Sequence, residues 1–115
     1  MKGLVFPVDF EFQKTDGFGN PVVKSTKLHN STEEIRCMLL ACVVVFARHN
    51  LKPIKHKSIQ VMLTNDVVRD PDEPEESWSG MAWKNQGKMI VRVYHDQDKT
   101  FTVLIHEYLH LLGYD

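Results

Sequence analysis

The sequence feature that most restricts how this chain can fold is an apolar run over residues 37–47, which contains no charged residue and no histidine. The run is too short to cross a bilayer, which takes roughly 18 or more apolar residues in a helix. We therefore expect the rest of a globular domain to cover it. Ser31 and Glu34 form a capping-box pattern just before the run and predict a buried helix that starts there. A strand over 43–45 is the alternative, because short apolar runs do not distinguish the two.

Alternating apolar and polar side chains predict strands on either side of this helix. The predicted strands cover residues 4–14, 58–63, 78–83 and 88–94, with 78–83 as a short edge strand. The turn-forming cluster at 16–21 predicts that residues 22–27 return along the first strand as a hairpin. The acidic, proline-containing segment 66–77 is predicted to be a solvated loop.

The last predicted element is a helix that starts at Asp98 or Thr100 and stops at Gly113, where a glycine can take a positive φ. The full order is a hairpin, a buried backing helix, three strands and a C-terminal helix. This order predicts an α+β domain with a mixed or mostly antiparallel sheet. We expect residues 1–115 to form one domain, because domains commonly contain roughly 100–150 residues.

The predicted C-terminal helix carries an H-E-x-x-H motif made by His106, Glu107 and His110. Residues four apart lie one turn apart on the same face of a helix, so both imidazoles can bind a single Zn²⁺ ion. Glu107 lies beside them, where a carboxylate can take a proton from a zinc-bound water. The motif therefore predicts a zinc site with Glu107 as its catalytic base.

The segment from His106 to Asp115, H-E-Y-L-H-L-L-G-Y-D, resembles the zincin metallopeptidases. In the metzincin branch the chain turns sharply at a glycine placed like Gly113 and brings in a third ligand. The resemblance implies a small zincin-like domain in which 78–83 is an edge strand that binds extended peptide. Trp78 and Trp83 would then line a substrate groove, with covering of the core as the alternative role.

The same ending also resembles the bacterial endoribonuclease family that matures ribosomal RNA, whose motif reads H-G-x-L-H-L-x-G-Y-D-H. The matching positions are Leu109, His110, Leu111, Gly113, Tyr114 and Asp115. Glu107 departs from that motif, which has glycine there. The balance of 14 Lys and Arg against 15 Asp and Glu also provides no general basic surface for RNA.

The identity of the third zinc ligand is open, because both families place it one residue beyond Asp115, where the given sequence stops. The given chain is then cut just before the ligand, or Asp115 completes the site through its side chain or terminal carboxylate. The remaining alternative is a partner chain or another histidine. The histidines outside the motif are His29, His49, His56 and His95, of which His95, just before the last helix, is the least remote.

These observations predict a cytoplasmic, zinc-dependent hydrolase, with a metallopeptidase acting on peptide or protein substrates as the main hypothesis. A metal-dependent endoribonuclease for single-stranded RNA and a non-catalytic binding module with a zincin-like fold are the alternatives. Cys37 and Cys42 are spaced too far apart on a helix to form a disulfide, which favours a reducing compartment. Asp9 and Glu11 interrupt the N-terminal segment too early for a signal peptide, and no membrane segment is expected.

Overall fold

The structure is a computed structural model that describes residues 9–22, 27–49, 51 and 56–114. It contains two α-helices, six strands and one short 3₁₀ helix. In chain order these are β1 (Asp9–Lys14), α1 (Thr32–Arg48), β2 (Ser58–Thr64), β3 (Val68–Asp70), β4 (Glu73–Trp78), β5 (Gly80–Trp83), η1 (Lys84–Gln86), β6 (Lys88–Arg92) and α2 (Gln97–Leu112). Within these ranges no helix is long and apolar enough to cross a membrane.

Four strands form one mixed sheet in the order β1-β2-β6-β5. β1 and β6 both run parallel to β2, whereas β5 runs antiparallel to β6 at the edge. The predicted α+β class is thus confirmed, and the sheet is mixed rather than mostly antiparallel. β3 and β4 form a separate antiparallel hairpin.

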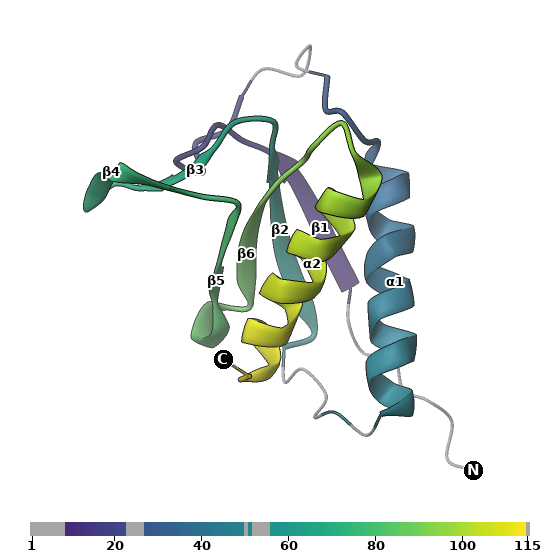
Figure 1. Cartoon of the computed structure of the whole chain (residues 1–115). Helices are drawn as coiled ribbons and strands as arrows, with labels where there is room; N and C mark the ends of the chain where they lie inside the picture. Colours follow the sequence, from purple (N-terminus) through teal and green to yellow (C-terminus); the bar gives the residue numbers. More distant parts are fainter. Residues whose placement is uncertain (1–8, 23–26, 50, 52–55, 115) are drawn as a thin grey trace.

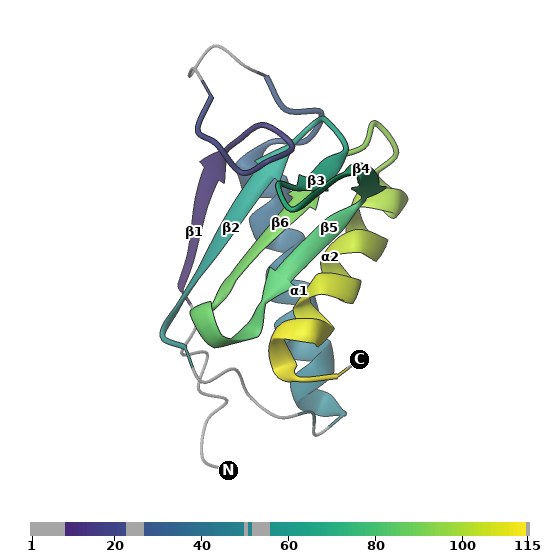
Figure 2. The ribbon, with the colours of Figure 1, turned by 90° about the vertical axis from the view of Figure 1, so that its left-hand side faces the viewer.

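Both helices cover the same face of the sheet, as the two perpendicular views show (Figures 1 and 2). Strict alternation in β2 turns Ile59, Val61 and Leu63 toward the helices, where all three are fully buried. The helices meet them with apolar side chains, chiefly Ile35, Leu39, Leu104 and Leu111. This packing gives a two-layer domain with a single core between sheet and helices.

Helix α1 begins as predicted, but it is not covered on all sides. Ser31 caps it and exchanges hydrogen bonds with Glu34, which confirms the capping box. The segment 43–45 is helical, so the strand alternative is wrong. Leu40 and Val45 remain 43% and 46% exposed, because α1 is an outer helix that buries one face only.

One predicted assignment is wrong, and another lies only partly within the described residues. β1 pairs in parallel with β2, and the described start of the predicted hairpin is a bridge between Thr15 and Pro21 with a hydrogen bond from the Val22 N–H to the Lys14 carbonyl. Residues 4–8 and 23–26 of the predicted hairpin lie outside the described residues. The acidic segment is not a loop, since it contains β3 and β4, which are joined by the pairing of Val68 with Trp78.

Helix α2 starts slightly earlier than predicted. Its cap is Asp96, whose carboxylate accepts a hydrogen bond from the backbone N–H of Asp98, rather than Asp98 or Thr100. Thr100 is buried, and its hydroxyl instead accepts a hydrogen bond from the backbone N–H of Tyr94. The helix ends as predicted at Gly113, which has a φ of 100°.

Candidate metal centre

Helix α2 brings the two histidines of the motif together. The Nε2 atoms of His106 and His110 lie 3.0 Å apart, with the two rings perpendicular at 89°. Two Zn–N bonds of roughly 2.0–2.1 Å at a tetrahedral angle would separate the nitrogens by about 3.3 Å. The side chains are therefore arranged so that small rotations let both imidazoles bind one zinc ion.

A turn after the helix fixes the orientation of His110. The backbone N–H groups of Gly113 and Tyr114 donate to the carbonyls of His110 and Leu109, a Schellman motif that needs the positive φ of Gly113. The turn places the Tyr114 carbonyl 3.0 Å from His110 Nδ1. Since a carbonyl only accepts, Nδ1–H donates to it, so Nε2 of His110 carries the lone pair; this lone pair accepts from His106 Nε2–H, a hydrogen bond that a bound metal would replace.

Glu107 is only 4% exposed although it is an acidic residue. Burial raises its pKa to about 7, and the nearby His110 opposes part of that rise. A carboxyl group that titrates near neutral pH is well matched to accepting and returning a proton in the same reaction. Its environment therefore suits the predicted role of general base.

Gly80 in β5 makes the buried position of Glu107 possible. A β-carbon at Gly80 would lie 2.8 Å from Glu107 Cγ and 2.9 Å from Glu107 Oε2, closer than side chains tolerate. The strand backbone can approach the carboxylate only because this residue has no side chain. The sequence pattern predicts an edge strand that includes Gly80 but does not predict this contact; the signal was a glycine inside a strand pattern.

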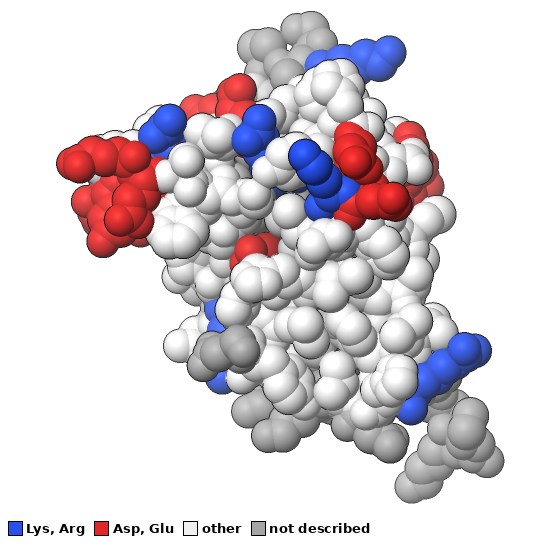
Figure 3. Space-filling model, viewed as in Figure 1, with Lys and Arg blue, Asp and Glu red and all other residues white. Residues whose placement is uncertain are grey.

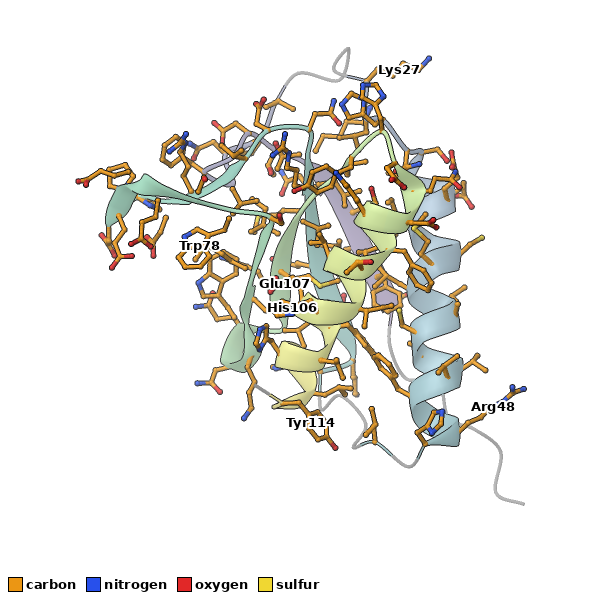
Figure 4. All side chains as sticks on the ribbon, in the orientation of Figure 1. Lys27, Arg48, Trp78, His106, Glu107 and Tyr114 are labelled. Atoms are coloured by element: carbon orange, nitrogen blue, oxygen red, sulfur yellow. The ribbon has the colours of Figure 1, made fainter. Side chains whose placement is uncertain are left out.

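The motif faces a cleft of about 510 Å³ between α2 and the edge strand β5. Figure 4 shows Glu107 and His106 on the side of α2 that is turned toward β5, with Trp78 opposite them. The lining residues are Trp78, Gly80, Met81, Ala82, Lys84, His106, Glu107, His110 and Gly113. β5 is the last strand of the sheet, so the cleft runs along a strand edge that the sheet does not pair.

The described residues do not supply a third zinc ligand. Asp115 lies outside the described residues, and in the rest no group of three or more His, Cys, Asp or Glu side chains is placed to hold a metal. His95 stacks on His29 with ring centroids 3.6 Å apart. His95 precedes α2, whose first residue, Gln97, is about 14 Å along the helix axis from His106.

The other candidate histidines are also placed elsewhere. His56 lies 2.8 Å from the carbonyl of Lys84, to which its Nε2–H donates, and His49 follows the end of α1. Of the aromatic candidates, Trp78 lines the cleft and is exposed, whereas Trp83 is half-buried beneath the ammonium of Lys88. Tyr114 contributes its backbone carbonyl to His110.

Comparison with known proteins adds no family to these observations. No family model matches the chain, and searches of curated proteins and of solved structures find no match. The geometry of the cleft is therefore the main evidence for a function.

Proposed function

We propose that this protein is a zinc-dependent hydrolase, and specifically a metallopeptidase. The observation that carries the proposal is the convergence of His106 and His110 Nε2, 3.0 Å apart, beside the buried carboxyl group of Glu107. All three side chains line one cleft. Two neutral imidazoles and an adjacent proton acceptor form the ligand and base set of a hydrolytic zinc site.

In the proposed peptide hydrolysis each group of cleft residues has a separate role. His106 and His110 would hold the zinc, which when bound lowers the pKa of water and polarises a carbonyl group. Glu107 accepts the proton of the attacking water and returns it to the amine that leaves. β5 aligns an extended peptide through backbone hydrogen bonds along its unpaired edge.

The charge around the cleft favours a peptide over RNA. The hairpin that leads into the cleft through Trp78 exposes acidic side chains, namely Asp72, Glu73, Glu75 and Glu76. Figure 3 shows this acidic cluster over the tip of β3 and β4. Such a surface repels a phosphate backbone. An endoribonuclease therefore remains only the second hypothesis, supported by the resemblance of residues 109–115.

The two cysteines support a cytoplasmic location for this activity. Cys37 is exposed and Cys42 is buried, and neither forms a disulfide. Burial raises the pKa of the Cys42 thiol to about 11, so it behaves as a small apolar core residue. Unpaired thiols of this kind are typical of a reducing compartment.

The decisive experiment combines zinc content with the variant Glu107→Gln. We expect one zinc per chain in the purified protein and in the variant, because the amide leaves both imidazoles in place. Peptide cleavage should fall by at least about a hundredfold, the usual effect of losing a general base. Glu33→Gln, an exposed position in the first turn of α1, is the matched control and should retain full activity.

Three outcomes would contradict the proposal. Cleavage that survives Glu107→Gln would remove Glu107 from the mechanism. Cleavage of single-stranded RNA without any effect on peptides would favour the endoribonuclease. Failure of the full chain to bind zinc under saturating conditions would favour a non-catalytic binding module.

A further inference from the structure

Lys84 is the only Lys or Arg among the residues that line the cleft. It is the first residue of η1, directly after the edge strand β5, and its side chain is exposed. Its Nζ atom lies 3.3 Å from the position that a β-carbon at Gly113 would occupy. The ammonium group therefore lies over the turn that ends α2, in space that Gly113 leaves open.

The backbone of Lys84 is held in place, which limits where its ammonium can reach. The Lys84 carbonyl accepts hydrogen bonds from His56 Nε2 at 2.8 Å and from the N–H of Gly87 at 3.4 Å. Within the described residues no acidic side chain forms an ion pair with this ammonium. Among the residues that the structure describes, Lys84 thus presents an unpaired cation at one end of the cleft.

The distance along the cleft from the two histidines to Lys84 can be counted as a number of residues in an extended peptide substrate. A zinc ion shared by His106 and His110 would lie level with the residue midway between them, and Gly113 is about 7 Å further along α2. An extended peptide advances roughly 3.3 Å per residue. For a peptide that lies along the cleft beside α2, the cation would therefore face the substrate about two residues from the bond level with the two histidines.

We infer that Lys84 determines substrate specificity by binding a carboxylate about two residues from the cleaved bond. This inference rests on the proposed peptidase function and names its substrate class. The carboxylate is an Asp or Glu side chain or the free C-terminus of the peptide, and both would form a charge-assisted hydrogen bond with the ammonium. Since the contact is remote from the reacting atoms, it strengthens substrate binding and lowers KM rather than raising kcat.

The test compares cleavage by the zinc-loaded full chain and its variants Lys84→Gln and Lys84→Glu. A mixture of peptides is digested, and mass spectrometry locates carboxylates relative to each cut. Matched peptides are then made with Glu, Gln or Lys at that position, each with a free or an amidated C-terminus. The free and amidated forms separate recognition of the terminus from recognition of a side chain.

We expect Lys84→Gln to raise KM about tenfold for carboxylate peptides and to leave neutral peptides within about twofold. Lys84→Glu should reverse the preference in favour of peptides with Lys. Lys88→Gln, which removes a neighbouring cation outside the cleft lining, should behave like the parent protein. If Lys84 only stabilised the end of α2, its variants would alter all peptides equally, and the inference would be wrong.

Binding to the zinc-loaded variant Glu107→Gln separates this inference from the proposed function. Calorimetry with the carboxylate and amide forms of one peptide needs no turnover. A tenfold preference for the carboxylate that Lys84→Gln abolishes would support the inference even if no cleavage occurred. Equal binding of both forms would overturn it even if the protein is a peptidase. If Lys84→Gln reduced cleavage of RNA but had no effect on peptides, the inference would also be wrong, and the cation would instead bind phosphate.

Discussion

Helices α1 and α2 lie on the same face of the sheet, yet they bury different kinds of side chain (Figure 1). The buried residues of α1 are Ile35, Leu39 and Cys42, all apolar. Those of α2 include Thr100, Glu107 and Tyr108 among the leucines. Burying a carboxyl group costs stability that an apolar residue would not cost. This difference predicts a division in which α1 contributes mainly to stability, whereas α2 gives up stability to hold the side chains of the proposed site.

The largest expected effect is on α1, where Leu39→Ala should lower the free energy of unfolding by about 2–5 kcal/mol. Leu39 is fully buried, so the change leaves a cavity beneath the helix. Urea denaturation measures the loss. Leu40→Ala is the matched control, because that neighbour is 43% exposed and should cost less than about 0.5 kcal/mol. Loss of zinc binding by folded Leu39→Ala protein would contradict the division.

The next effect concerns α2 and depends on pH. The pKa of Glu107 in the folded protein is about 7, against the ordinary 4.5, so the folded state holds its proton more tightly than the unfolded state does. Below pH 4.5 the carboxyl group is protonated in both the folded and the unfolded state, so its ionisation does not reduce stability. As pH rises from 4.5 to 7 its destabilising effect grows, and above pH 7 the effect is constant. In metal-free protein the free energy of unfolding should fall by about 3 kcal/mol across this range.

Urea denaturation with a chelator present, from pH 4.5 to 8, measures this dependence. Glu107→Gln cannot titrate at that position, so its stability should lack this component. Parallel stability curves for the two proteins would show that Glu107 is not the group responsible.

A smaller effect is expected from Gly80→Ala, which acts on α2 from the opposite wall of the cleft. The new methyl group would overlap Glu107 Cγ, so the carboxylate must move away from its position beside the histidines. We expect kcat to fall about tenfold, since an error of about 1 Å in a catalytic group can cost more than that. Zinc content should stay at one per chain. Unchanged kcat would show that the close approach of β5 is unimportant for the base.

The smallest effects should come from the two helix caps. Ser31→Ala and Asp96→Ala each remove a side chain that accepts a backbone N–H, at a cost of about 1 kcal/mol. Because Asp96 is remote from His106 along α2, neither change should alter kcat or KM. Thermal unfolding measures the loss of stability, and peptide cleavage measures kcat and KM. Ser31→Asp, which retains a cap, is the control. A kinetic effect of Asp96→Ala alone would extend the functional part of α2 to its first turn.

Features that depend on neighbouring residues could be predicted from the sequence. The capping box of Ser31 and Glu34, the glycine turn after α2 and the grouping of His106, Glu107 and His110 each involve residues within a few positions. Their geometry follows from the periodicity of a helix and from the freedom of glycine at positive φ. The edge strand β5 also agreed with its predicted position.

Features that depend on distant contacts could not be predicted in this way. Alternation in β1 shows which side chains share a face, but it does not identify β2 as the parallel partner. β4 is exposed throughout and contains Pro74, so its sequence has no apolar period and is typical of a loop. The contact between Gly80 and Glu107 joins two separate elements: a glycine inside a strand indicates a close approach, but it does not identify Glu107 as the residue that approaches.

The hydrogen bond from His110 to the Tyr114 carbonyl has a thermodynamic consequence for the end of α2. If closure of the turn prepares His110 to bind zinc, then linkage requires bound zinc to favour the closed turn by the same free energy. Ion occupancy and closure of the turn between Leu109 and Tyr114 would then be two measures of one equilibrium. The helix end would respond to the supply of zinc.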